Sequence, residues 1–319
     1  MRPALRPINL GEILDRTFQI YRSRFLAFVG IAAIPAVAMR LVYLVDSTWL
    51  HVHSLFEPEW RSGEVMWNFV VALCFYHVSS FLFLLVLPAH IKLASCVILD
   101  EGASFRSSLR FAIARLGSYL WITCLKLAAG LLIPELIVAG LIIGEAVLAQ
   151  LTGAFDNLEG TAILPAFIVP ALIGAAVFLW LLPRLSLAMP AAALENLKGF
   201  KSLRRSWTLS RGTRSRILFT WVGVSLLSGL AQSVAEYLLR LGYNVFARDL
   251  HAAVITRSIY LPAAAFLTIA IVTLIGPINH IALTLFYYDQ RIRKEGFDIE
   301  RMMEATGLDE RPALPAGGQ

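Results

Sequence analysis

Six long apolar segments dominate the pattern of hydrophobic and polar positions along this chain. Each one is longer than the roughly 20 residues that an α-helix needs to cross the hydrocarbon core of a bilayer. The pattern therefore predicts an all-α, polytopic membrane protein with six transmembrane helices. The predicted spans are residues 25–46, 67–99, 118–150, 162–194, 217–239 and 258–288.

A second pattern recurs with a period of about 95 residues, as is typical of internal repeats. Three times, a proline inside an apolar segment is followed twelve residues later by an acidic residue, and an aromatic residue stands four positions before an arginine. The first set is Pro88 and Asp100, Pro183 and Glu195, and Pro277 and Asp289; the second is Phe18 and Arg22, Phe111 and Arg115, and Trp207 and Arg211. We predict three pseudo-repeats, residues 8–100, 103–195 and 198–289, within one membrane domain of residues 1–308. Residues 309–319 are rich in Pro and Gly and are predicted to form a disordered tail.

Each predicted repeat opens with a short polar segment of helical periodicity. In the first, Asn9 stands three residues before Glu12, which is a variant of the capping-box pattern. Apolar residues then recur on one helix face and charged residues on the other, and the segments that start near Ser104 and Phe200 repeat this arrangement. Such helices lie in the membrane interface with the apolar side toward the lipid. A repeat is therefore predicted to contain one amphipathic interfacial helix and two spans.

The repeated prolines lie about 20 residues into the second span of each repeat, a length that already crosses the hydrocarbon core. Proline removes one backbone hydrogen bond and bends a helix. We therefore predict helix bends at Pro88, Pro183 and Pro277, near the inner interface, with the apolar residues beyond them lying along the interface or leaning into the bundle. Gly140 and Gly144 form a GxxxG pair of the kind that permits close helix contact.

Composition supports the predicted spans, and the distribution of charge predicts on which side of the membrane the termini and loops lie. Hydrophobic residues make up 58% of the chain and charged residues only 16%, with a mean hydropathy of +0.69. The formal net charge of +6 is concentrated at the two ends and in the loops between repeats. Loops rich in Lys and Arg stay cytoplasmic, so both termini are predicted on the cytoplasmic side of a bacterial inner (plasma) membrane. Topology accounts for this charge, and we predict no nucleic-acid partner because no recognition module accompanies it.

Two motifs carry a resemblance to a known family. The first is Leu-Gly-Glu-Ile-Leu-Asp at residues 10–15, with Phe18, Tyr21 and Arg22 after it; the second is YYDQRIRKEGFD at residues 287–298. They resemble the bacterial glycerophosphoryl diester phosphodiesterase membrane-domain proteins. The resemblance implies an integral membrane domain of six helices without an established activity. Some members of that family also carry a soluble catalytic barrel that begins with His-Arg-Gly, but no His-Arg pair occurs in this sequence.

Motifs for the common catalytic chemistries are missing from the sequence. It contains no Gly-x-Ser-x-Gly elbow, no Walker loop and no His-Glu-x-x-His helix. We therefore predict a protein that is not an enzyme and that uses no cofactor or metal.

Basic residues beside the predicted spans are the first candidates for binding. Each such charge contributes about 1 kcal/mol of attraction to anionic lipid. The alternative is that these charges only set the membrane topology. The candidate residues for anionic headgroups are Arg22, Arg115, Lys201, Arg204, Arg205 and Arg211.

Ionisable residues inside the spans are the second group of candidates, because such residues often mark ion or proton pathways. His77, Lys126 and Glu135 could line a shared polar cavity, although none of them recurs in the other repeats. Buried structural hydrogen bonds are the alternative.

Polar residues just beyond the predicted bends are assigned structural roles. His90 and Arg184 are expected to anchor their helices at the interface. Asn279 and His280 are expected to bond the carbonyls that Pro277 leaves free.

The leading hypothesis is a non-enzymatic inner-membrane protein that acts as a lipid-interacting scaffold or accessory subunit. Its expected partners are anionic membrane lipids, with a membrane protein as a further candidate partner. The alternative is a transporter or lipid translocator with a path between the helix-pair repeats.

Overall fold

The computed structural model describes residues 6–49, 74, 78, 81–82, 84, 86–151, 163–246 and 261–306. Every regular element in these residues is helical. The predicted all-α class is therefore confirmed for the described part of the chain.

Helix α1 (Leu10–Ser23) begins at the capping box that the sequence predicts. The Asn9 side chain accepts a hydrogen bond from the Glu12 backbone N–H at 2.8 Å, and the Glu12 carboxylate accepts one from the Asn9 N–H at 3.4 Å. Helix α2 (Phe25–Trp49) then leaves α1 at an angle of 90°. The first polar helix and the first apolar helix are therefore separate, perpendicular elements.

The middle of the chain repeats this order of a short helix followed by a long apolar one. Helix α4 (Phe105–Ala114) leads into α5 (Leu116–Leu127), which continues through the π-helical turn η1 (Ala128–Leu132) into α6 (Ile133–Leu151). Helix α7 (Ile163–Leu185) runs two residues past Pro183 before the chain turns at residues 186–187 into α8 (Ala188–Leu194).

The last part of the chain contains the short helix α9 and the two longest helices. Helix α9 (Phe200–Leu209) precedes α10 (Arg214–Phe246), and α12 (Leu261–Glu295) is continuous through Pro277. Gly296, at a φ of +66°, then joins α12 to α13 (Phe297–Thr306). This positive φ is a backbone conformation that glycine adopts without steric cost. The bends at the three prolines remain a prediction.

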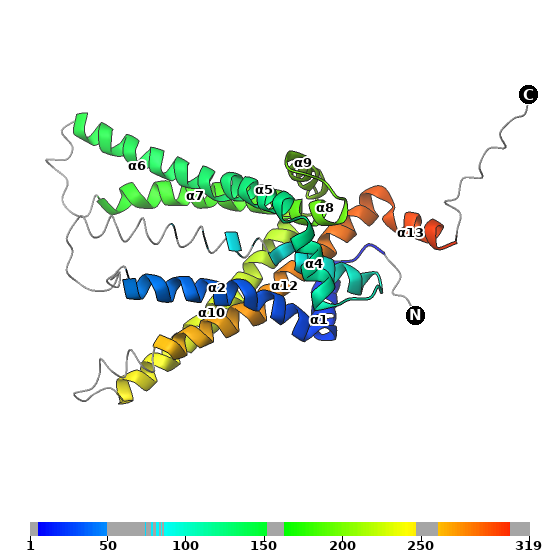
Figure 1. The fold of residues 1–319 in the computed structure, drawn as a ribbon. Helices are drawn as coiled ribbons and strands as arrows, with labels where there is room; N and C mark the ends of the chain where they lie inside the picture. Colours follow the sequence, from blue (N-terminus) through cyan, green and yellow to red (C-terminus); the bar gives the residue numbers. More distant parts are fainter. Residues whose placement is uncertain are drawn as a thin grey trace, which may run out of the picture.

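The long helices share one end, and the short helices gather there (Figure 1). Helices α6 and α7 run side by side, as do α10 and α12, while α1 and α2 also pack against α12 (Figure 1). From this common end the two helix pairs diverge. The first and the last described helices, α1 and α13, both lie at the common end (Figure 1).

Membrane-spanning capacity can be judged by helix length and composition. In the described residues four helices are long and apolar enough to span a bilayer, or five if α1 and α2 count as one bent span. Residues 67–73 of the second predicted span, and several between 75 and 85, lie outside the described residues, and its described part includes the apolar helix Val86–Ile98. The chain is thus a multi-pass membrane protein by these criteria, while six spans and three repeats remain predictions.

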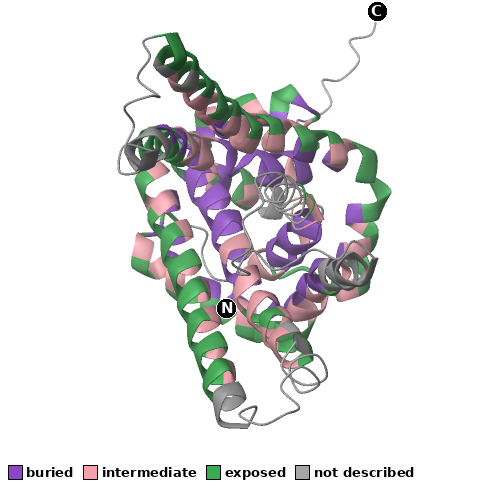
Figure 2. Ribbon diagram, turned by 90° about the vertical axis from the view of Figure 1, so that its left-hand side faces the viewer, coloured by how far each residue is buried: buried purple, intermediate pink, exposed green. Residues whose placement is uncertain are grey.

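The hydrophobic core lies at the common end and contains the segments that follow the three repeated prolines. One cluster joins Leu93, Leu187 and Phe286, one from each of these segments, to Ile13 of α1 and Phe28 of α2. Buried residues concentrate inside the bundle and exposed ones on its outside (Figure 2). Many exposed side chains of α6, α10 and α12 are large and apolar, such as Leu136, Phe219 and Phe266, as expected for surfaces that face lipid.

The closest backbone approach between α6 and α7 does not use the predicted glycine pair. A Cβ built at Gly140 or Gly144 meets nothing within 4 Å, so the expected role of that pair in close packing is wrong within the described residues. At Gly174 of α7, by contrast, a Cβ would lie 2.3 Å from the Val138 Cγ2 atom of α6. The lack of a side chain at Gly174 therefore allows Val138 of α6 to pack against the backbone of α7.

Candidate functional site

Polar side chains from the end of α12 connect most of the elements that meet at the common end. We call this group the α12 hub: Tyr287, Tyr288, Asp289, Arg291, Arg293, Lys294 and Glu295, all within the closing motif. Its contacts decide which charges of the chain have internal partners and which are available to a ligand.

Asp289 ties the N-terminal segment to the hub. Its side chain is fully buried and accepts the backbone N–H of Ile8 at 2.9 Å and the Arg293 Nε at 3.0 Å, and Arg216 Nη1 lies 3.5 Å away. The Ile8 carbonyl accepts hydrogen bonds from Arg293 at 2.8 Å and from Arg216 at 2.9 Å. Both backbone groups of Ile8 are thus held by charged side chains, which form stronger bonds than neutral ones.

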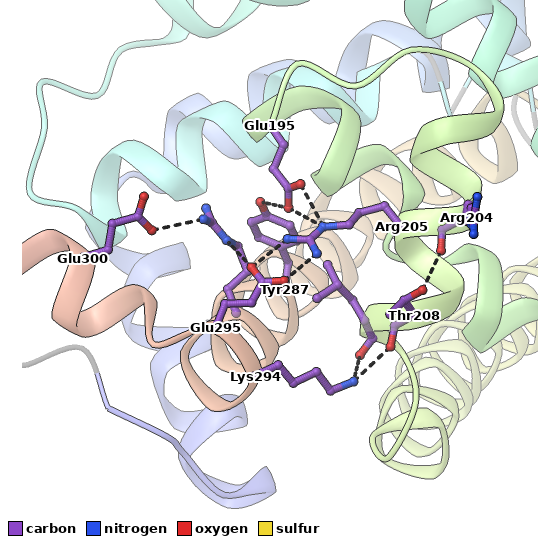
Figure 3. Close-up of polar contacts among 10 residues, drawn as sticks. Glu195, Arg204, Arg205, Thr208, Tyr287, Lys294, Glu295 and Glu300 are labelled. Atoms are coloured by element: carbon purple, nitrogen blue, oxygen red, sulfur yellow. Dashed lines mark hydrogen bonds and ion pairs between the residues drawn. The ribbon is translucent and has the colours of Figure 1, made fainter.

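Arg205 of α9 lies between two carboxylates (Figure 3). Its Nε donates to Glu195 at 2.8 Å and its Nη2 to Glu295 at 2.7 Å, while the Tyr287 hydroxyl donates to Glu195 at 2.8 Å. The adjacent carboxylates of Glu295 and Glu195 raise the pKa of the Arg205 guanidinium above its usual value. Arg205 is therefore an internal bridge, although the sequence placed it among the residues that bind headgroups.

Lys294 makes a second connection between α9 and the hub, and Tyr288 connects the Val86–Ile98 helix to it. The Lys294 ammonium donates to the carbonyls of Thr208, Leu209 and Arg211 at 2.8–3.0 Å, which satisfies the carbonyls at the C-terminal end of α9 (Figure 3). The Tyr288 hydroxyl lies 2.7 Å from the Ser95 hydroxyl on the Val86–Ile98 helix. Lys294 and Tyr288 of the closing motif therefore both have structural roles.

The remaining predicted headgroup residues are exposed. Arg22, Lys201, Arg204 and Arg211 have no side-chain partner among the residues that the structure describes, whereas the Arg115 Nη1 donates to the Asn196 side chain at 2.6 Å. Arg204 and Arg205 are neighbours in sequence, yet Arg204 points away from the hub (Figure 3). The predicted basic set thus divides into one internal residue and five exposed ones.

A hollow of about 530 Å³ lies where α4 meets α5, opposite the loop that leads into α9. It is lined by residues 113–119, 192 and 196–198. Two of its lining residues, Arg115 and Lys198, are exposed cations. The hollow also includes the N-terminus of α5, which has no side-chain cap. The Ser118 and Tyr119 N–H groups donate to the Arg115 carbonyl at 3.0 and 3.2 Å, and the positive end of the helix dipole favours an anion. The hydroxyl of Tyr119, a residue only 1% exposed, is buried without a hydrogen-bond partner in the described structure.

A group of aromatic and basic side chains marks the level at which α7, α9 and α10 meet. The Arg184 guanidinium carbon lies 3.7 Å from the Trp180 ring centroid and 5.3 Å from that of Trp207, and Arg214 stands 5.6 Å from Trp207. Trp residues are enriched where the hydrocarbon meets the headgroups. The interfacial role of Arg184 remains a prediction.

A smaller cavity, of about 310 Å³, lies among α5, η1, α7, α10 and α12. Lys126 lines it, together with Asn279 and His280 of α12. Glu135 is not among its lining residues, and His77 lies outside the described residues. Of the three residues predicted to share a polar cavity, only Lys126 is therefore placed in one.

Two histidines that the sequence assigned to structural roles are in contact, and one of them, His280, lines the cavity together with Lys126. His90 is fully buried and so does not anchor its helix at the interface as predicted; its ring nitrogens lie 3.3 Å from the Val86 carbonyl and 3.2 Å from the Phe28 carbonyl. The His90 and His280 ring centroids are 4.8 Å apart. Sequence reasoning missed this pair because its members are 190 positions apart, although both stand two or three residues after a repeated proline.

Comparison with known proteins gives one match. Residues 155–306 match the family model of the membrane domain of glycerophosphoryl diester phosphodiesterase. No curated protein and no solved structure matches. The matched range includes the closing motif but not the opening one, and the match is to the membrane domain rather than to a catalytic domain. Over residues 155–306 the chain is therefore similar to the membrane domain of glycerophosphoryl diester phosphodiesterase, in agreement with the resemblance that the closing motif indicates.

Proposed function

We propose that this chain is a non-enzymatic membrane protein that binds anionic lipid headgroups on the face formed by α5, α9 and the loop between α8 and α9. The observation that carries the proposal is the hollow with Arg115 and Lys198 at its edge and the N-terminus of α5 within it. A phosphate in this hollow would meet two cations and the positive end of a helix dipole. The family match supports the membrane assignment and leaves the lipid open.

The surroundings of the hollow are those of a site at the membrane interface. Ile113, Leu116 and Trp121 are large, apolar and exposed beside it, so they are available to lipid chains. Lys201 and Arg204 extend the positive charge along α9, and neither has a side-chain partner in the described residues. The protein would then act as a scaffold or accessory subunit in the bacterial inner membrane, with its termini in the cytoplasm and a membrane protein as a further partner.

Spin-labelled lipids in reconstituted vesicles test this proposal. The quantity measured is the immobilised fraction of spin-labelled phosphatidylglycerol relative to that of phosphatidylcholine around the full-length protein. The double change Arg115→Gln and Lys198→Gln should abolish most of the preference for the anionic lipid. The matched control is Arg106→Gln with Arg110→Gln, which removes the same charge from two exposed residues of α4 that do not line the hollow.

Equal losses in the two double variants would mean that the charge acts without a site, and the proposal would be wrong. In that case the basic residues only set topology.

The alternative function, a transporter or lipid translocator with a path between the helix pairs, has one supporting observation. Lys126 lines a cavity among α5, η1, α7, α10 and α12. Flux of a labelled lipid across proteoliposomes distinguishes the two functions, because a scaffold leaves the flux at the level of protein-free vesicles.

A further inference from the structure

The cavity around Lys126 combines an apolar wall with two polar groups that have no partner in the described part of the chain. Ten of its fifteen lining residues are Leu, Ile, Phe or Trp, and the others are Lys126, Gly130, Ser186, Asn279 and His280. We propose that this cavity binds a single-chain anionic amphiphile, whose anionic group lies at Lys126 and His280 and whose alkyl chain lies against the leucines.

The polar end of the proposed site rests on Lys126 and His280. Lys126 has no hydrogen-bond or ion-pair partner in the described residues, and the His280 Nδ1 atom is buried without one. An unpaired ammonium group costs several kcal/mol when it is taken out of water. An anion between the two side chains would accept hydrogen bonds from both and remove this cost.

His90 does not supply the missing hydrogen-bond partner of the His280 Nδ1 atom, although the two rings are in contact. Both ring nitrogens of His90 already lie within 3.3 Å of backbone carbonyls, those of Val86 and Phe28. These contacts to the Val86–Ile98 helix and to α2 fix the orientation of the His90 ring. The ring packs against His280 without bonding it. The Nδ1 atom of His280 is left for a ligand.

The apolar part of the site fits one alkyl chain. Ligand cavities commonly measure about 300–1,000 Å³, so a cavity of about 310 Å³ is at the small end and has room for one chain rather than two. The π-helical turn η1 directly follows Leu127, and it places Gly130 and Leu131 in the cavity wall. Single π-helical turns occur frequently at functional sites, and the missing side chain of Gly130 widens the cavity toward Leu185.

This site is independent of the proposed headgroup hollow, because the two share no lining residue. A failure of one proposal therefore leaves the other untouched. The ligand could be a carboxylate, such as a fatty acid, or a phosphate monoester on an alkyl chain, since both present an anion on one chain.

Photolabelling of the purified full-length protein tests the inference, with a diazirine derivative of palmitic acid as the probe. We expect mass spectrometry to find the label on peptides that contain residues 127–131 and 279–283. Lys126→Met should reduce this labelling about tenfold or more, since hydrogen bonds to charged groups contribute about 1.5–3 kcal/mol. Arg106→Met, which removes an exposed cation of α4 that lines neither cavity, is the matched control and should leave labelling unchanged.

Competition experiments on the wild-type protein decide the chemistry even if a variant does not fold. Palmitate or dodecyl phosphate should displace the probe, and the stronger of the two identifies the anionic group. Hexadecanol has the chain without the charge and should compete at least tenfold more weakly. Equal competition by hexadecanol, or equal labelling of Lys126→Met and wild type, would overturn the proposal.

Gly130→Leu provides a second test, by size instead of charge. A Cβ at residue 130 would lie 3.7 Å from Leu185 Cδ1, which is ordinary contact, so the backbone tolerates a side chain there. The longer leucine side chain should fill the cavity and reduce labelling, whereas Gly130→Ala should retain most of it. Full labelling of the Gly130→Leu variant would contradict the assignment of the cavity.

Discussion

Replacing Asp289 by Asn removes one charge from the hub and keeps the shape of the side chain. The asparagine oxygen can still accept the Ile8 N–H, but its NH₂ group would face the donors of Arg293 and Arg216. Breaking a buried ion pair by removing one partner costs about 3–5 kcal/mol. Arg293 and Arg216 are 41% and 24% exposed and recover part of their hydration, so we expect a loss of about 2–3 kcal/mol.

Hydrogen exchange of the Ile8 amide measures this loss directly. The amide exchanges only when the N-terminal segment leaves the hub, because its hydrogen goes to the Asp289 carboxylate. A loss of about 2–3 kcal/mol corresponds to exchange about 30- to 150-fold faster. The assay is mass spectrometry of the N-terminal peptide from protein in detergent, together with the midpoint of thermal unfolding.

Glu300→Gln is the matched control for this experiment. It also removes a carboxylate near the end of α12, but Glu300 is half exposed and its contact with Arg291 is 3.4 Å long, so we expect a cost below about 1 kcal/mol. If Asp289→Asn and Glu300→Gln gave the same exchange rate at Ile8, the stabilising role of the contact between Ile8 and Asp289 would be refuted.

Two further changes test the packing and the polar bridge. Gly174→Val should push α6 from α7 because its Cβ alone would lie 2.3 Å from Val138, at a cost of about 1–3 kcal/mol in unfolding free energy; Gly140→Val should cost far less, and equal unfolding midpoints would contradict the contact. Arg205→Lys should destabilise the protein by about 1–2 kcal/mol because an ammonium cannot donate to two carboxylates in the fork geometry of arginine. A thermal midpoint for Arg205→Lys no lower than that of Lys201→Arg, a conservative change at an exposed position, would show that the bridge is not stabilising.

Local features of the structure could be predicted from the sequence, and features that depend on distant partners could not. The capping box at Asn9 and Glu12 is contained in four consecutive residues, so its pattern is visible in the chain. Arg204 and Arg205 look equivalent in sequence, and Arg205 is internal because it meets both Glu195 and Glu295, the second of them ninety residues away. The contact of Gly174 likewise depends on Val138 of the preceding helix, and a spacing rule within one helix cannot reveal it.

The distribution of partners separates residues that hold the fold from residues that are free to bind. Every polar side chain from residue 287 to residue 295 has a hydrogen bond or ion pair inside the protein. Similarity to the family across the closing motif is therefore explained by the joining of helices at the common end, without reference to a ligand. Groups without a partner in the described structure lie outside this motif: the Tyr119 hydroxyl and Lys126 precede the matched residues 155–306, and the His280 Nδ1 atom lies within them. A ligand of this chain should accordingly be sought around these three groups rather than in the closing motif.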